Sequence, residues 1–86
     1  MEKYRLVIKK SAAKELENIP RHDLRRIISK IQDLSTNPRP PGAQKLSNFE
    51  LYRIRQGDYR IVYTIDDMII EVHINKIGHR KDVYNF

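Results

Sequence analysis

Apolar and polar residues alternate along segment 51–65, and this alternation predicts two β-strands joined by a short turn. One strand is expected over residues 51–55 and the next over residues 59–65, with Gln56-Gly57-Asp58 as the turn between them. Side chains on a strand point alternately to its two faces. One face of the hairpin is therefore apolar, and we expect the following side chains to enter the core from it: Tyr52, Ile54, Tyr59, Ile61 and Tyr63.

The opposite face of this hairpin is expected to carry Arg53, Arg55 and Arg60. Like charges opposite one another on neighbouring strands destabilise a sheet. Two unit charges about 6 Å apart repel by roughly 2–3 kcal/mol at an effective dielectric constant of about 20. A solvated outer face is the simplest interpretation. Folding alone gives no reason for such a cluster, however, whereas an anionic partner would offset the repulsion.

Before the hairpin, the pattern predicts a strand and two helices. Residues 4–9 alternate as a strand. A short helix is expected over residues 12–18 with Ser11 as its N-cap. A second helix is expected to begin at Pro20 and to end at Asn37-Pro38. Apolar residues recur along the second helix at helical spacing, namely Leu24, Ile27, Ile28, Ile31 and Leu34.

The remaining segments complete one sheet. Residues 38–42 form a proline-rich loop, and residues 43–47 lead into the hairpin with Leu46 as a core residue. Asp66-Asp67 is a second turn, and the last strand runs over residues 70–75. This order predicts an α+β fold in a single domain over residues 1–86: an N-terminal strand, a helical hairpin and a three-stranded antiparallel meander, with the helices packed on one face of the sheet. The three arginines would then lie on the other face.

The composition favours a small globular domain that meets a negatively charged partner. The 86 residues include 17 Lys and Arg against 11 Asp and Glu, a net charge of +6, which points to a polyanion or an acidic protein. Cysteine is absent from the sequence, which excludes disulfides and Cys-based metal sites. No apolar run has the length of a signal peptide or a membrane span. We therefore expect a cytoplasmic protein without membrane association.

Few residue patterns suggest catalysis. His22, His73 and His79 lie on different predicted elements, so we expect no metal site and a structural role for the first two. No glycine pattern for a nucleotide cofactor is present. The remaining candidates are the arginine face and segment 78–84, where Arg80 and Tyr84 would share one side of a helical turn. If the partner is RNA, arginines suit the phosphate but carry protons poorly. The acid and base for cleavage would then be found among three residues, Tyr84, His79 and Lys81.

Three sequence blocks resemble those of RelE toxins in the RelE/ParE superfamily: Leu51-Tyr52-Arg53-Ile54-Arg55, Gly57-Asp58-Tyr59-Arg60-Ile61-Val62-Tyr63 and Gly78-His79-Arg80-Lys81-Asp82-Val83-Tyr84. The resemblance covers essentially the whole chain. It implies a type II toxin that cuts mRNA in the ribosomal A site, without metal or cofactor, by attack of the 2′-OH. It also implies three partners, namely a cognate acidic antitoxin that wraps the toxin, the ribosome and mRNA. We expect the toxin without its antitoxin to be a monomer.

The resemblance assigns the phosphate contacts to Arg53, Arg55, Arg60 and Arg80 and proton transfer to Tyr84, and His79 is a further catalytic candidate on its chemistry. Contacts to RNA are expected from the other basic residues Arg21, Arg25, Arg26, Lys30, Lys45 and Lys81. The basic residues of the second helix could equally form a solvated surface. Two other functions stay open: a ParE-like inhibitor of DNA gyrase without catalysis, and a module that only binds RNA or an antitoxin.

Overall fold

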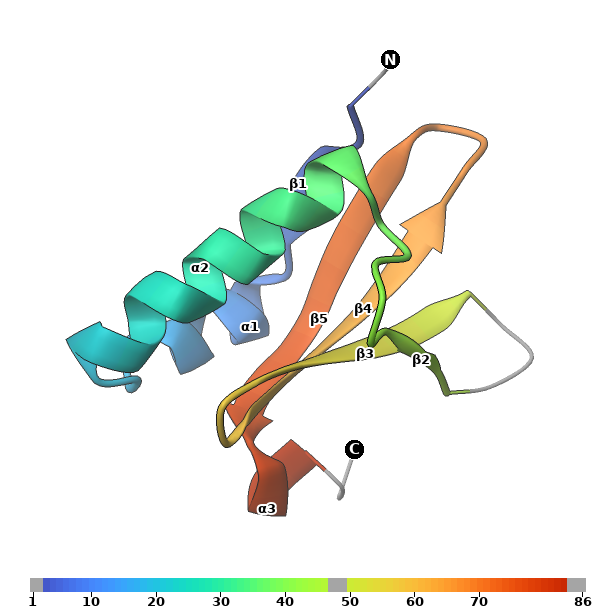
Figure 1. Cartoon of the computed structure of the whole chain (residues 1–86). Coiled ribbons are helices and arrows are strands. Elements are labelled where there is room, and N and C mark those ends of the chain that lie inside the picture. Colours follow the sequence, from blue (N-terminus) through green and yellow to red (C-terminus); the bar gives the residue numbers. More distant parts are fainter. Residues whose placement is uncertain (1–2, 47–49, 84–86) are drawn as a thin grey trace.

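The chain forms one mixed sheet with two helices on one face and a single-turn helix after the last strand (Figure 1). The computed structural model describes residues 3–46 and 50–83. In chain order the elements are β1 (Arg5–Ile8), α1 (Lys10–Leu16), α2 (Arg21–Thr36), β2 (Gln44–Lys45), β3 (Leu51–Gln56), β4 (Tyr59–Asp66), β5 (Glu71–His79) and α3 (Arg80–Val83).

The strands lie in the order β1-β5-β4-β3-β2. The antiparallel meander of β3, β4 and β5 confirms the prediction, and so does the α+β class. Two details of the sheet were not predicted. β1 lies parallel to β5 at one edge of the sheet. At the other edge, residues 44–45 form the short strand β2 within the segment that we expected to be a connection.

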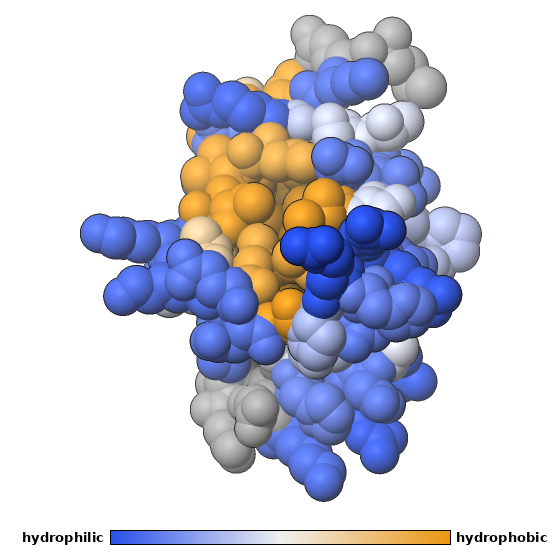
Figure 2. Space-filling model, turned by 90° about the vertical axis from the view of Figure 1, so that its left-hand side faces the viewer, coloured by the Kyte–Doolittle hydropathy of each residue, from blue (hydrophilic) through white to orange (hydrophobic). Residues whose placement is uncertain are grey.

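α2 follows the predicted amphipathic pattern most closely. Ile27, Ile31 and Leu34 are buried on its inner side, and Asn37 ends the helix as expected. Ile28 belongs to the same stripe, yet 39% of its surface is exposed. The side of the molecule that carries α1 and the beginning of α2 shows apolar surface bordered by hydrophilic side chains (Figure 2). The two helices therefore leave part of the apolar interior uncovered on this side.

The beginning of α1 differs from the prediction. The helix starts at Lys10, directly after β1, with Lys9 at the N-cap position and no side-chain hydrogen bond to cap it. Ser11 is therefore a residue of the first turn, and the prediction that it caps the helix was wrong. The helix starts earlier because the chain leaves β1 at Ile8, and Ala13 N–H already donates to Lys9 O at 2.9 Å.

The core lies between the helices and the apolar face of the hairpin. Tyr52 and Tyr63 are buried there, and Tyr59 packs against their cluster, which confirms their predicted place in the core. Leu46 is not a core residue, because 40% of its surface is exposed. Its N–H donates to Leu51 O at 2.8 Å, so its backbone continues the edge pairing of β2, outside the area that α1 and α2 cover.

Both predicted turns are present. Gly57 has a φ of +59°, a value that suits the first central residue of a two-residue hairpin turn and that glycine adopts without strain. In the second turn, Asp66 Oδ1 accepts hydrogen bonds from Met68 N–H at 3.0 Å and from Ile69 N–H at 3.3 Å. This is the usual way in which an aspartate stabilises a turn.

Candidate active site

The register of the β3–β4 hairpin brings three arginines to one face of the sheet. Arg55 lies directly opposite Arg60, and Arg53 lies opposite Val62. Because side chains alternate along a strand, Arg53, Arg55 and Arg60 all point away from the face that α2 covers. The predicted clustering of these three residues is thus what the structure shows. We call these three residues the arginine face.

Arg60 is the unusual member of the arginine face because it is buried. Only 5% of its surface is exposed, and its Nε has no hydrogen-bond partner among the described residues. Its Nη1 donates a long hydrogen bond of 3.4 Å to Tyr59 O. A buried charge without full hydrogen bonding is costly for a fold. This position is therefore better explained by an anion that meets the guanidinium than by stability alone.

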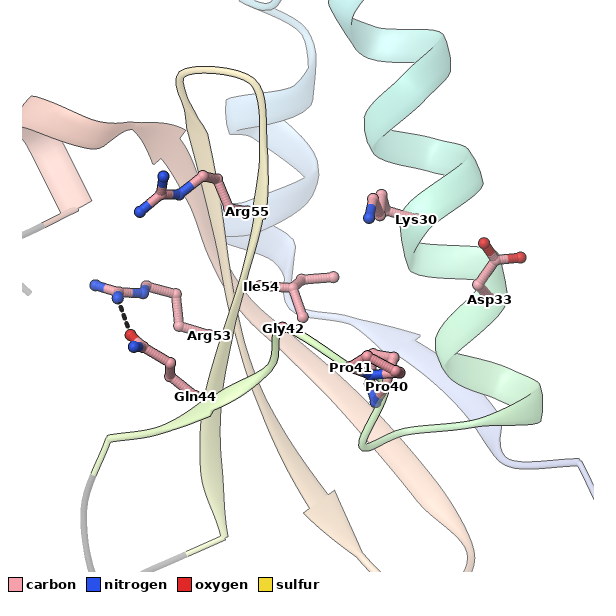
Figure 3. Close-up of a pocket in the computed structure, with 9 residues that line it drawn as sticks. All are labelled: Lys30, Asp33, Pro40, Pro41, Gly42, Gln44, Arg53, Ile54 and Arg55. Atoms are coloured by element: carbon pink, nitrogen blue, oxygen red, sulfur yellow. Dashed lines mark hydrogen bonds between the residues drawn. The ribbon is translucent and has the colours of Figure 1, made fainter.

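Arg53 and Arg55 point to the same side of the hairpin, away from α2, whereas Ile54 between them points toward α2 (Figure 3). Arg53 Nη2 donates a hydrogen bond to Gln44 Oε1 on β2, which orients that guanidinium. Arg55 is exposed, and its side chain makes no hydrogen bond or ion pair with the described residues. The pair can thus offer planar donor groups to one anion, such as a phosphate.

α3 brings the fourth arginine to the same end of the sheet. Arg80 is the first residue of α3, and its N–H donates to Asp58 O in the β3–β4 turn at 2.7 Å. α3 lies on the opposite side of the hairpin from α2, below the sheet in Figure 1. The Arg80 side chain is exposed. The backbone bond to Asp58 therefore holds a further cation beside the turn that links β3 to β4.

His79 lies apart from the arginine face. It is opposite Tyr59 in the sheet, and their rings meet edge to face with centroids 5.9 Å apart. Its Nδ1 accepts a hydrogen bond of 3.4 Å from Lys81 N–H. His79 thus shares the helix-covered face with Tyr59, while Arg60 and Arg55 point to the other face. Tyr84, the predicted proton carrier, lies outside the described residues.

The other basic residues predicted to bind RNA are spread over several elements. Four exposed ones lie on α2, namely Arg21, Arg25, Arg26 and Lys30, and Lys81 is exposed on α3. Lys45 on β2 forms an ion pair with Glu50 at 3.0 Å. α2 covers the face of the sheet opposite to the one that Arg60 points to. Lys30 nevertheless lines the same groove as Arg53 and Arg55.

Several groups with a shifted pKa lie at the opposite end of the sheet from the β3–β4 turn. There, hydrogen bonds from Arg39 lower the pKa of the Glu50 and Asp67 carboxyl groups. Burial raises the pKa of Tyr63 to about 12, and its hydroxyl donates to Pro38 O at 2.7 Å. These groups bind the loop after α2 to the sheet. They are structural in character and are separate from the arginine face.

Within residues 3–46 and 50–83, no three His, Cys, Asp or Glu side chains lie close enough together to hold a metal ion. No helix in the same part of the chain is long and apolar enough to cross a lipid bilayer. His73, expected to be structural, has its Nε2 2.9 Å from Glu71 Oε1. His22 is exposed on α2.

Comparison with known proteins places this fold in a family. A family model described as the ParE toxin of the type II toxin–antitoxin system parDE matches residues 6–84. The chain belongs to the RelE/ParE toxin superfamily. A protein named as a RelE1 toxin from Methanocaldococcus jannaschii is 33% identical over 88 residues, which cover 95% of this chain and 96% of that protein.

Other members of this superfamily agree with the assignment. Toxin RelE of Mycobacterium tuberculosis is 32% identical over 83 residues, covering 94% of this chain and 86% of its own length. The RelE–RelB complex from Pyrococcus horikoshii contains a chain with a TM-score of 0.81 and 28% identity, covering 93% of this chain and 98% of that chain. This protein is therefore a RelE-type toxin of a type II toxin–antitoxin system.

Some features around the toxin's arginine face were not visible in its sequence. Gln44 orients Arg53, although nothing in the sequence pattern marks Gln44 as part of a site. Asp58 was expected to be a turn residue only, yet its carbonyl holds the first residue of α3. The sequence offers one weak signal for these two residues, namely that they lie near the predicted arginines along the chain. Asp58 lies in the same hairpin as those arginines.

Proposed function

We propose that this toxin is a ribosome-dependent endoribonuclease that cuts mRNA in the ribosomal A site, in the cytoplasm, and so inhibits translation. The observation that supports this proposal most directly is the register that sets Arg55 opposite Arg60 on an outer face, with Arg60 buried and incompletely hydrogen-bonded. Such an arrangement is unfavourable until an anion arrives. A strained phosphate in RNA is the anion that planar, permanently charged guanidinium groups stabilise best.

In the proposed reaction, the ribose 2′-oxygen of mRNA attacks the adjacent phosphorus while the bond from phosphorus to the 5′-oxygen breaks. The 2′-OH gives its proton to a base, and the leaving 5′-oxygen takes a proton from an acid, so the products are a 2′,3′-cyclic phosphate and a 5′-OH. Arg53, Arg55, Arg60 and Arg80 would hold the phosphate and stabilise the charge of the five-coordinate transition state. The nucleophile belongs to the RNA, so this scheme requires no metal ion.

Tyr84 is our proposal for the proton-transfer residue, because Arg80 and Lys81 lie close to it in the sequence and cations favour the anionic form of a tyrosine. His79 is the weaker candidate, because its ring lies against Tyr59 on the helix-covered face. Replacement of Tyr84 by Phe should slow cleavage about 10²–10⁴-fold, the usual contribution of a general acid or base. Binding to ribosomes should change little, which a sedimentation assay can measure.

A translation extract programmed with one defined mRNA tests the proposal. The toxin should create new RNA ends at codons in the A site, and a 2′-deoxy nucleotide at the cut position should abolish cleavage. Arg60→Ala and Arg80→Ala should each reduce the rate by about 10²-fold or more. Lys14→Ala, which removes an exposed charge on α1, is the matched control and should cleave like the parent. Equal cleavage by all three variants would show that the site is assigned wrongly.

Metal independence needs its own measurement, because ribosomes require magnesium. A phosphorothioate at the scissile phosphate should slow cleavage, and Mn²⁺ or Cd²⁺ should not restore the rate. Rescue by either thiophilic ion would show direct metal contact with the phosphate.

The alternative is a toxin that inhibits DNA gyrase without catalysis, as ParE-type relatives do. The family model that matches this chain is described as that of the ParE toxin, and this description supports the alternative. A supercoiling assay separates the two: inhibition of gyrase together with intact translation would favour the alternative. A module that only binds RNA would show salt-sensitive association without new RNA ends.

We further propose that a cognate, acidic antitoxin holds this toxin inactive. Solved structures of similar chains are toxin–antitoxin complexes, including RelBE2 of Mycobacterium tuberculosis, whose matching chain is 27% identical with a TM-score of 0.78 over 91% of this chain and 99% of that chain. The net charge of +6 suits such a partner.

A further inference from the structure

An irregularity in β5 changes which of its side chains lie on the side of the arginine face. Val62 of β4 pairs with Lys76, but the next residue of β4, Tyr63, pairs with Ile74, so β5 contains one extra residue, Asn75, at this point. Such a β-bulge reverses the alternation of the side chains that follow it, and bulges are common beside active sites, where they redirect a side chain. Regular alternation from Ile74 would have put Lys76 on the helix-covered face.

The bulge instead places Lys76 on the same side of the sheet as the arginine face. Opposite residues of an antiparallel pair share a face, so Lys76 lies on the side to which Val62 and Arg60 point. Val62 is also opposite Arg53, so Arg53, Val62 and Lys76 form one row across three strands. Because neighbouring strands lie about 4.8 Å apart, the Cα atoms at the two ends of this row are separated by about 10 Å.

The burial of neighbouring residues confirms this reversal. Ile77 is 1% exposed and belongs to the core cluster, and the His79 ring meets Tyr59 on the helix-covered face. Neither residue would lie there if the alternation along β5 were regular. A bulge depends on the pairing with β4, so the sequence pattern alone does not mark Lys76 as a residue of the outer face.

Glu15 of α1 holds the Lys76 side chain at the edge of the sheet. Lys76 Nζ lies 3.3 Å from Glu15 Oε2, while Glu15 Oε1 accepts a hydrogen bond of 2.9 Å from Ile77 N–H. β1 ends at Ile8, opposite Ile74, so the carboxylate binds β5 just beyond the end of β1. Both side chains of the ion pair are 29% exposed, and ion pairs of this kind add little stability. The bond to Ile77 does not depend on Lys76, so the ammonium group can exchange the carboxylate for another anion.

We propose that Lys76 is a further RNA-contact residue, which leaves Glu15 to bind a phosphate next to the one that the arginine face holds. The inference rests on the proposed function in taking RNA as the ligand. A compact ammonium group binds phosphate as a point charge. A separation of about 10 Å across the row suits neighbouring phosphates of one strand better than a single phosphate. Glu15 would then compete with RNA for Lys76.

The first test measures binding of the purified full chain to a labelled 2′-O-methyl hexauridylate, which attack of a 2′-OH cannot cut. Lys76→Met should weaken binding about threefold or more and reduce the slope of log affinity against log salt by about 0.7, the share of one phosphate in a single strand. Lys76→Arg keeps the charge and should retain most of the affinity. Lys14→Met, which removes an exposed charge on α1, is the control and should bind like the parent. Equal affinities of Lys76→Met and Lys14→Met would overturn the proposal.

The second test asks whether Glu15 competes with RNA. Glu15→Gln removes the competing charge but keeps an oxygen that can accept the Ile77 N–H bond, and slow hydrogen exchange of that amide, measured by NMR, checks that the edge of β5 is intact. The substitution should tighten RNA binding in the parent but not in Lys76→Met. Glu17→Gln, the same change at an exposed position, measures the effect of net charge alone. If Glu15→Gln tightens binding equally with and without Lys76, or no more than Glu17→Gln does, the exchange between Glu15 and phosphate does not occur.

These measurements contain no ribosome and no cleavage step, so their failure is distinguishable from failure of the proposed nuclease activity. Binding that depends on Lys76, without cleavage of mRNA in the translation extract, would overturn the nuclease proposal and leave the Lys76 contact standing. A parent chain that does not bind the hexamer at millimolar concentration would overturn the contact. Hexaglutamate is the competing probe: if its affinity depends on Lys76 and that of the RNA does not, Lys76 serves an acidic protein and the proposal is wrong.

Discussion

Arg60 illustrates at the scale of one residue how a function can oppose stability. It lies opposite Arg55, is 5% exposed, and leaves its Nε without a partner among the described residues. A buried ionic group with incomplete hydrogen bonding destabilises a fold, and replacement by an apolar residue of similar length is often neutral or stabilising. The sequence predicted the face on which Arg60 lies, but its burial depends on neighbouring strands.

We therefore expect Arg60→Met to stabilise the toxin while it abolishes cleavage. The free energy of unfolding should rise by about 1–2 kcal/mol, because the substitution removes a buried charge opposite Arg55. For a domain of this size each 1 kcal/mol corresponds to a shift in melting temperature of roughly 4–8 °C. Calorimetry and the translation extract measure the two effects on the same sample.

Lys14→Met is the control for Arg60→Met, because Lys14 is an exposed cation on α1. It should change the melting temperature by no more than a degree or two, as surface substitutions usually do, and leave cleavage as it is. A lower melting temperature for Arg60→Met would mean that Arg60 contributes to stability, and no anion would then be needed to explain a buried arginine at this position.

At the scale of an element, the two sides of α2 carry different kinds of residues, apolar on one side and basic on the other. Ile27, Ile31 and Leu34 fill the core, and this side was predictable because a helix repeats every 3.6 residues. The opposite side carries Arg21, Arg25 and Arg26, all exposed. Because a helix repeats every 3.6 residues, these charged side chains face solvent whether or not they bind a partner. The sequence pattern is therefore the same for a docking surface and for a solvated one.

A triple variant of α2 tests whether its basic side docks on the ribosome. Replacing Arg21, Arg25 and Arg26 by Gln should weaken ribosome binding and reduce the slope of log affinity against log salt by about 2–3, roughly one for each phosphate that an arginine no longer neutralises. The cleavage step at saturating ribosome concentration should be unchanged. Binding measured over a series of potassium chloride concentrations gives the slope.

The matched control replaces Lys9, Lys10 and Lys14 by Gln, which removes the same net charge from exposed positions at and near α1. If both triple variants reduce the slope equally, the effect reports total charge, and α2 has no special role in docking.

At the scale of the whole molecule, Arg39 connects segments that are far apart in sequence. Its guanidinium donates to Tyr52 Oη at 3.0 Å and to Asp67 Oδ2 at 2.8 Å, and also binds Glu50. Tyr4 Oη donates to the same Asp67 carboxylate at 2.7 Å. The loop after α2, the beginning of β3, the β4–β5 turn and the start of the chain are thus joined at one point.

This network predicts a contribution to stability that acid removes. Hydrogen bonds from Arg39 lower the pKa of Glu50 and Asp67, so the folded state holds fewer protons than the unfolded state near their ordinary pKa values of about 4. Their contribution is present above that pH and is lost as pH falls through the lowered pKa values. Arg39→Met should therefore be less stable than the parent at neutral pH and lose less stability on acidification.

Urea unfolding at several pH values between about 6 and 3 measures this difference in slope. Arg21→Met is the charge-matched control, because Arg21 is exposed on α2 and the variant has the same net charge as Arg39→Met. Its acid slope should follow that of the parent. Parallel slopes for the parent and Arg39→Met would show that the network adds no pH-dependent stability.

The sequence by itself determined what depends on neighbours along the chain. Apolar and polar residues alternate on each side of Gly57, and this alternation was enough to predict the hairpin. It also placed Arg53, Arg55 and Arg60 on one face. A period of 3.6 was enough for α2. These properties follow from backbone geometry, which is the same wherever the segment lies in the molecule.

Only the tertiary structure decided what depends on pairing between distant segments. The parallel position of β1, the register that sets His79 against Tyr59 and the contacts of Arg39 all arise when separate elements dock. Several pairings of the same strands satisfy the local pattern equally well. The choice among them is made by the burial and hydrogen bonding of the whole sheet, which no single stretch of sequence contains.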